Sequence, residues 1–241
     1  MNATANVERT PLGRLRRHDG SPPALLATTG LALVLGVMAV VLLQVGTAQA
    51  QQRGPTAQTT ARVFLTFDDG PVRGNTARVL NVLANRGVRA TFFVVGKQAR
   101  WYPRLVKREY TEGHSVQNHT YTHPDLTTLS NTGIRRELRR TNRAVIAAGV
   151  PRPYRFRPPY GASNPRVKRV GASLGLTQTL WSVDPRDWAD PSPSVICRRV
   201  VGNASPGSIV LLHDGTGANT DEALPCIIKG LRAKGYTFGK L

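Results

Sequence analysis

From residue 62 onward, short apolar runs alternate with amphipathic segments. The apolar runs have the length of buried strands, and the segments between them repeat apolar positions at helical spacing. Strands are predicted at residues 63–67, 92–95, 115–117, 155–157, 177–181, 209–212 and 236–238. Helices are predicted at residues 76–86, 103–112, 134–148, 165–174, 193–201 and 224–234. This alternation is typical of an α/β protein with mainly parallel strands.

Turn and cap residues support these boundaries. Ser130 or Asn131 is suited to cap the helix at 134–148, and Gly149 is suited to end it. The pattern contains about seven strand–helix units, fewer than a complete (β/α)8 barrel has. We therefore expect a distorted, partly open (β/α)7 barrel.

The first 50 residues have the organisation of a membrane-targeting segment. Arg14, Arg16 and Arg17 precede an uncharged run at residues 24–45, and an A-x-A cleavage pattern follows at 48–50. The run is about 20 residues long, which is also enough to span a bilayer. The pattern fits a cleaved signal peptide and a retained N-terminal anchor equally well. Both place the rest of the chain outside the cytoplasm.

The rest of the chain reads as a linker followed by one domain. Residues 51–61 are small, polar and unpatterned. Residues 62–241 are enough for one domain with a sizeable core, and they contain no evident internal repeat.

The chain is strongly basic, with 33 lysines and arginines against 14 aspartates and glutamates and a net charge of +19 at pH 7. Such a balance favours a polyanionic partner, although each single arginine is better explained as a solvated surface residue. No nucleic-acid-binding motif accompanies the charge, and the targeting segment argues against nucleic acid. We therefore expect an anionic cell envelope to be the partner of this basic protein.

The two cysteines, Cys197 and Cys226, both lie in the part expected outside the cytoplasm. In an oxidising compartment, an even pair favours one disulfide over two buried thiols.

Two clusters have the composition of a metal site. Asp68 and Asp69 close the strand at 63–67, and His119 and His123 stand four residues apart. Alone, the acidic pair is an ordinary turn and the histidines are loop residues. If the histidines share one face of a helical turn, they and one Asp form an Asp–His–His set that leaves positions for water and substrate.

Three further clusters follow predicted strands, where barrels carry their active-site loops. They contain Arg157 with Tyr160, Asp187 with Trp188, and His213. Considered separately, they fit a stiff surface loop, a turn with a core tryptophan, and a core histidine.

Together and in this order, the segments TFDDG, HTYTH, RPPYG, DPRDW and LLHD resemble the five motifs of the polysaccharide deacetylase family (carbohydrate esterase family four, the NodB homology domain). The resemblance spans residues 62–241, which it marks as a deacetylase catalytic domain. It implies a metal-dependent hydrolase that removes N-acetyl groups from a polysaccharide.

The resemblance also implies residue roles. Asp68 is expected to be the general base, and Asp69, His119 and His123 to bind the metal. The backbone N–H of Tyr160 is expected to stabilise the oxyanion. The ion is expected to be Zn²⁺, with Co²⁺, Mn²⁺ and Ni²⁺ as alternatives.

The remaining roles concern the second catalytic group and the pocket. By the same resemblance, His213 is the general acid, and Asp187 pairs with it and keeps it cationic. Arg157 pairs with the catalytic base and keeps it ionised. Trp188 and Leu211 line the pocket for the acetyl methyl group.

The expected substrate is N-acetylglucosamine in peptidoglycan, followed by chitin or chitooligosaccharides. An acetylxylan esterase on the same fold and a non-catalytic envelope-glycan-binding protein are the alternatives. The protein is expected to be a monomer that is secreted or anchored to the outer face of the cytoplasmic membrane.

Overall fold

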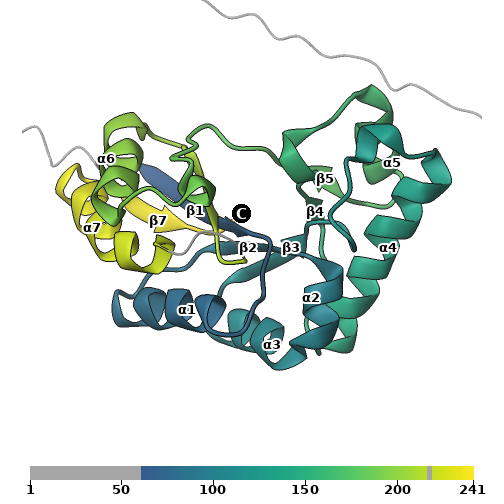
Figure 1. The fold of residues 1–241 in the computed structure, drawn as a ribbon, viewed down its shortest axis with the longest axis horizontal. Coiled ribbons are helices and arrows are strands. Elements are labelled where there is room, and N and C mark those ends of the chain that lie inside the picture. Colours follow the sequence, from purple (N-terminus) through teal and green to yellow (C-terminus); the bar gives the residue numbers. More distant parts are fainter. Residues whose placement is uncertain (1–60, 216–218) are drawn as a thin grey trace, which may run out of the picture. The chain divides into compact units, whose positions relative to one another are not determined.

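Parallel strands form one curled sheet at the centre of the protein (Figure 1). In this computed structural model, residues 61–215 and 219–241 are described, and they contain seven strands. The strands are β1 (Arg62–Asp68), β2 (Thr91–Val94), β3 (Ser115–Asn118), β4 (Arg155–Phe156), β5 (Thr177–Gln178), β6 (Ile209–His213) and β7 (Thr237–Gly239). Every pairing in the sheet is parallel, which confirms the predicted α/β class.

The sheet closes only in part. Its strand order is β5-β4-β3-β2-β1-β6, and β7 pairs with the first residues of β1. The outer strands in this order are β5 and β6. A bridge between Val183, in the segment after β5, and Val210 of β6 links the two sides. The curled, incompletely closed sheet confirms the distorted (β/α)7 barrel.

Helices lie along the outer side of the sheet (Figure 1). They are α1 (Asn75–Asn85), α2 (Gly96–Trp101), α3 (Pro103–Thr111), α4 (Asn131–Ala147), α5 (Pro165–Ala172), α6 (Pro193–Asn203) and α7 (Thr220–Ala233). Short 3₁₀ helices are η1 (Leu126–Thr128), η2 (Pro159–Gly161) and η3 (Asp187–Ala189). Each long helix buries one apolar face, as in α1, where Val79, Leu80 and Leu83 point into the core.

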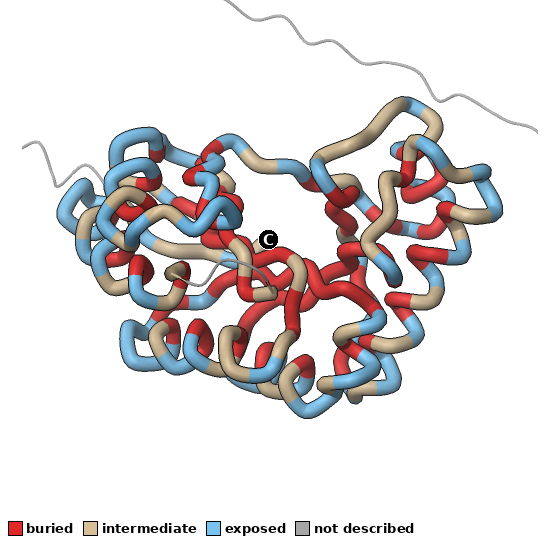
Figure 2. The backbone as a smooth tube through the Cα atoms, viewed as in Figure 1, coloured by how far each residue is buried: buried red, intermediate tan, exposed pale blue. Residues whose placement is uncertain are grey.

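The core follows the strands (Figure 2). One buried cluster joins the central strands to α1, α6 and α7, and Phe67 of β1 stacks on Phe92 of β2 within it. A second cluster lies between α4, α5 and β4, around Leu138 and Phe156. The strands are thereby fixed, and so are the loops that leave their carboxyl ends.

A disulfide joins the last two helices. Cys197 of α6 is bonded to Cys226 of α7, with Cα atoms 5.9 Å apart and a sequence separation of 29. The bond links two helices that pack against each other (Figure 1).

Several elements differ from the sequence prediction. Helix α2 was not predicted, because it is short and lies between a strand and a proline-started helix. Strand β5 ends before residue 179, because the carbonyls of Thr179 and Leu180 accept hydrogen bonds from Arg157. Helix α7 starts at Thr220, ahead of Pro225, and its first turn carries two acidic residues that suit a helix N-terminus.

The predictions for residues 1–50 and for all of the linker except residue 61 lie outside the described residues. Within residues 61–215 and 219–241, none of the helices has both the length and the apolar character to cross a membrane.

Candidate active site

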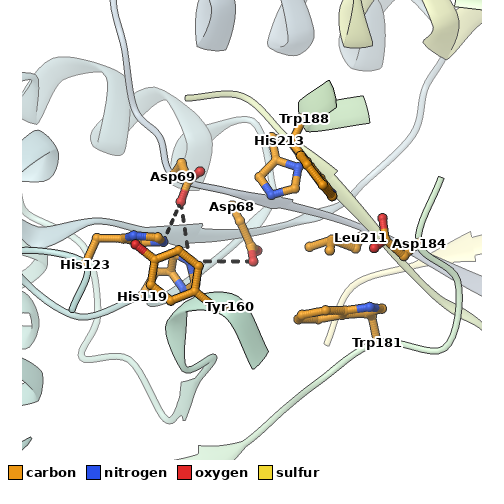
Figure 3. A pocket seen from close by; sticks show the side chains of 10 residues that line it. All are labelled: Asp68, Asp69, His119, His123, Tyr160, Trp181, Asp184, Trp188, Leu211 and His213. Carbon is orange, nitrogen blue, oxygen red and sulfur yellow. Dashed lines mark ion pairs between the residues drawn. The ribbon is translucent and has the colours of Figure 1, made fainter. Parts of the chain in front are cut away.

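A pocket of about 430 Å³ opens at the carboxyl ends of the strands (Figure 3). Parallel strands present their carboxyl ends at the same edge, so residues far apart in sequence meet there. The pocket is lined by Asp68, Asp69, His119, His123, Tyr160, Trp181, Asp184, Trp188, Leu211 and His213.

Asp68 and His213 are neighbours in the sheet. They are register partners at the ends of β1 and β6, and both side chains enter the pocket (Figure 3). Asp68 is almost fully buried, and its Oδ1 accepts a hydrogen bond from Arg157 at 2.7 Å. The sheet therefore sets these two groups side by side.

Arg157 crosses the interior of the barrel and is completely buried. Its guanidinium donates to Asp68, to the Thr66 hydroxyl at 2.8 Å, and to the carbonyls that end β5. The charged group also lies over the ring of Phe93, 4.1 Å from its centroid. A buried ion pair with further hydrogen bonds of this kind holds the Asp68 carboxylate in one orientation.

His119 and His123 lie in the loop after β3 and do not share a helical turn. Thr120 and His123 have φ values of 65° and 62°, in the left-handed region that non-glycine residues rarely adopt. These conformations bring the two imidazoles together, with ring centroids 4.9 Å apart. Asp69 and Tyr160 in neighbouring loops also have positive φ, so the unusual backbone gathers round the pocket.

Buried polar side chains hold this loop in place. Glu137 of α4 accepts hydrogen bonds from the backbone N–H groups of Tyr121 and Thr122 at 2.9 and 2.8 Å. The Asn118 side chain accepts from the N–H of Thr120. Glu137 was not predicted from the sequence as a residue of the site, although a carboxylate on the buried face of a helix is a recognisable signal.

Asp69, His119 and His123 form a group able to hold a metal ion. One ligand atom from each residue lies within 4.8 Å of the others. Asp69 Oδ1 is 3.4 Å from His119 Nε2 and 3.1 Å from His123 Nε2. The other ring nitrogen of His119 lies 2.8 Å from the Arg157 carbonyl, which orients the imidazole as protein ligands of metals are usually oriented. One carboxylate and two imidazoles suit a divalent cation with open positions.

His213 is held by Asp187, a fully buried residue of η3. The ring Nδ1 of His213 lies 2.8 Å from one carboxylate oxygen of Asp187, and the other oxygen accepts the backbone N–H of His213 at 2.8 Å. Thr220 donates its hydroxyl to the same carboxylate. Burial acts to lower the pKa of His213, but the hydrogen bond and charge of Asp187 outweigh it and raise the pKa to about 9.

Three further side chains line the pocket (Figure 3). They are Tyr160 of η2, Trp188 of η3 and Leu211 of β6. Tyr160 has a φ of 60°, and its ring contacts that of His123 with centroids 4.8 Å apart. The side chains of Tyr160 and Trp188 are largely exposed, whereas Leu211 is buried at the base. The structure thus brings every predicted catalytic, metal-binding and pocket residue to one pocket, with Arg157 and Asp187 behind it.

Three residues of the site were not identified as site residues from the sequence. Trp181 and Asp184 line the pocket, and an aromatic residue at the end of a predicted strand was the available signal for Trp181. Asp214 lies buried next to His213 and accepts a hydrogen bond from Thr76. Burial raises the pKa of Asp214 to about 7.

Known proteins are similar to this chain in sequence and in fold. The family model described as polysaccharide deacetylase matches residues 56–179. A chitooligosaccharide deacetylase of Rhizobium leguminosarum bv. trifolii is 45% identical, over 70% of this chain and 78% of its own length. The peptidoglycan-N-acetylglucosamine deacetylase PgdA of Listeria monocytogenes is 40% identical, over 76% of this chain and 39% of its own length.

A solved structure gives the same result. The family 4 carbohydrate esterase from Streptomyces lividans in complex with acetate superposes with a TM-score of 0.71 and 41% identity, covering 74% of this chain and 92% of that chain. At 41% identity, this similarity indicates a shared family as well as a shared fold. The chain belongs to the polysaccharide deacetylase family, carbohydrate esterase family four, and is a deacetylase of the hydrolase class.

Proposed function

We propose that this protein is an exported, metal-dependent enzyme that hydrolyses the N-acetyl groups of N-acetylglucosamine units in a polysaccharide, with peptidoglycan as the first candidate. The observation that carries the proposal is one pocket that combines three features. These are a metal-ligand set of one carboxylate and two imidazoles, a carboxylate held by a buried arginine, and a histidine held by a buried aspartate.

The ion would be held by Asp69, His119 and His123. Among Zn²⁺, Co²⁺, Mn²⁺ and Ni²⁺, Zn²⁺ best fits a ligand set of two nitrogens and one oxygen. When bound there, a divalent cation lowers the pKa of a water molecule and polarises the acetyl carbonyl. Histidine ligands must be neutral to bind a metal, so protons compete with the ion for this site.

Asp68 is the proposed general base. It lies beside the metal ligands, with its Oδ2 3.7 Å from His119 Nε2, and Arg157 binds its other oxygen. Its carboxylate accepts the proton of the water that attacks the amide carbon. Because Arg157 occupies Oδ1, Oδ2 is the oxygen that faces the ligand set.

Two groups complete the reaction. In the described part of the chain, the backbone N–H of Tyr160 donates no hydrogen bond to another backbone group, so it is available to the developing oxyanion. His213, kept protonated by Asp187, donates a proton to the leaving nitrogen. The C–N bond then breaks, and the products are acetate and a free amino group on the sugar.

The walls of the pocket suit an acetyl group attached to a sugar. Leu211 offers a buried apolar surface for the methyl group. Trp188, 46% exposed at the rim, offers an indole face on which a sugar ring can stack.

The choice of polymer rests on the relatives and on charge. Relatives are named as deacetylases of chitooligosaccharides and of peptidoglycan N-acetylglucosamine. The net charge of +19 favours a substrate in an anionic envelope, which supports peptidoglycan before chitin. The targeting pattern at residues 1–50 supports export, either as a secreted protein or as one anchored to the membrane.

Acetylxylan esterase remains the second candidate, because an O-acetyl group presents the same carbonyl to the site. A non-catalytic glycan-binding role is disfavoured, because such a protein would be expected to lack a ligand or the base. We propose that the protein acts as a monomer, since one chain supplies the whole site.

An acetate-release assay on three substrates tests the proposal. The substrates are peptidoglycan, chitooligosaccharides and acetylated xylan, each incubated with purified residues 51–241 and Zn²⁺. Release from the N-acetylated glycans, greatest for peptidoglycan, is the expected result. Preferential release from xylan would overturn the N-deacetylase assignment.

A further inference from the structure

A second groove adjoins the proposed metal ligands. It has a volume of about 300 Å³ and shares Asp69 and His123 with the active-site pocket. Lys97, Gln98 and Trp101 of α2 form much of its wall. Because the two hollows share Asp69 and His123, they meet at the proposed metal ligands, and one polymer could occupy both.

Trp101 and Lys97 form a pair within this groove. Trp101 is 58% exposed, an unusual exposure for so large an apolar side chain. The ammonium of Lys97 lies over its ring, 4.7 Å from the centroid. A cation over an indole is held in place without being neutralised.

Lys97 is the uncompensated cation of the groove. Within residues 61–215 and 219–241, none of the ion pairs includes Lys97. Asp69, the acidic residue of the groove wall, belongs to the ligand set. The groove therefore offers an aromatic surface and a positive charge side by side.

The position of Lys97 is tied to the metal site by the backbone. The N–H of Gly96 donates to the carbonyl of Thr120 at 2.8 Å, and the N–H of Lys97 donates to that of Tyr121 at 3.0 Å. Both acceptors belong to the loop that carries His119 and His123. The first turn of α2 is therefore fixed to the histidine loop, and with it the backbone position of Lys97 relative to the proposed metal ligands.

We propose that this groove binds the sugar next to the one being deacetylated, and that Lys97 makes the enzyme prefer a neighbour that carries a carboxylate. Trp101 stacks on the apolar face of that sugar, and Gln98 is a hydrogen-bonding partner for its hydroxyl groups. The lactyl group of muramic acid has the required carboxylate wherever no stem peptide is amide-linked to it, whereas a chitin strand has no acid. This inference rests on the proposed deacetylase function and identifies a specificity residue for it.

The test compares three soluble tetrasaccharides in acetate release. One alternates N-acetylglucosamine with N-acetylmuramic acid and carries free lactyl carboxylates, the second is the same with those carboxylates converted to amides, and the third is chitotetraose. Replacing Lys97→Met should lower kcat/KM for the acidic substrate roughly threefold to fivefold, the size expected of one partly exposed ion pair. The amidated substrate and chitotetraose should be unaffected, and Lys97→Arg should restore the preference.

Lys107→Met is the matched control, because Lys107 makes the same kind of contact with Tyr110 on α3 and does not line either hollow. It should leave all three rates unchanged, and Trp101→Ala should lower all three alike. Equal effects of Lys97→Met on the acidic and amidated substrates, or none on either, would overturn the inference. A wild-type enzyme inactive on all three would instead overturn the proposed function beneath it.

Discussion

Glu137 accepts two hydrogen bonds from Thr122, one from the backbone N–H at 2.8 Å and one from the hydroxyl at 3.1 Å. Thr122 stands between the two histidines of the proposed metal site, so a buried carboxylate on α4 holds the loop that presents them. The contact links packing to chemistry, because the left-handed residues of this loop need outside support to keep their conformation.

Removing that support should weaken metal binding. For Glu137→Ala we expect the dissociation constant for Zn²⁺ to rise roughly tenfold to a hundredfold, as is usual when groups behind metal ligands are lost. Isothermal titration calorimetry would measure it. Glu112→Ala, which removes a partly exposed glutamate paired with Arg108, is the control and should bind as the wild type does. Unchanged affinity in Glu137→Ala would show that the loop holds its shape without the carboxylate.

The two adjacent aspartates should separate in their effects. Asp68→Asn removes the proposed base and should lower kcat by roughly a hundredfold to ten-thousandfold, while the protein still binds one metal ion. Asp69→Asn should lose both turnover and the ion. Metal analysis of the two purified variants, beside acetate-release rates, checks this. A variant at Asp68 that loses the ion, or one at Asp69 that keeps it, would reverse the assigned roles.

The Asp187–His213 pair predicts the alkaline limb of the pH profile. The general acid must be protonated, and the pKa of His213 is raised to about 9, so kcat/KM should fall as the pH rises through about 9. In Asp187→Asn, burial acts without the opposing carboxylate, so the pKa of His213 falls and the limb moves to lower pH. Asp221→Asn, which removes an ion pair with Arg78, is the control. A limb that stays in place in Asp187→Asn would exclude His213 as the acid.

The disulfide should stabilise the protein without taking part in the reaction. Cys197 and Cys226 have a sequence separation of 29, and losing a crosslink over a loop of this size should lower the free energy of unfolding by about 3–4 kcal/mol. Urea unfolding of the double variant Cys197→Ser/Cys226→Ser measures this against the wild type. Its rate of acetate release in the absence of urea should be unchanged. Two free thiols found by mass spectrometry in protein prepared without reductant would contradict the crosslink.

The fold was predictable from sequence because strands and helices follow simple periodicities. The strands whose residues are buried on both faces, such as β1 and β2, appear as apolar runs, and glycines mark several helix ends. The length of β5 was not predictable, because Arg157, distant in sequence, takes the carbonyls of Thr179 and Leu180. Tertiary contacts of this kind override local pattern.

The site was predictable to the extent that its residues form short motifs. Asp68, Asp69, His119, His123 and His213 each stand at or after a strand, and parallel strands bring such positions together. The loop conformation of the histidine pair was not predictable, since it depends on positive φ values and on Glu137 from another helix. The groove at Lys97 and Trp101 lies on α2, a helix too short to give a clear periodic signal.

The central claim is that Asp69, His119 and His123 hold a metal ion on which deacetylation depends. The most direct measurement is acetate release from peptidoglycan by chelator-treated protein, titrated with Zn²⁺ while bound metal is counted. We predict that the metal-free protein releases no acetate and that activity rises in proportion to bound ion up to one per chain. Full activity in protein shown to contain no metal would contradict the account.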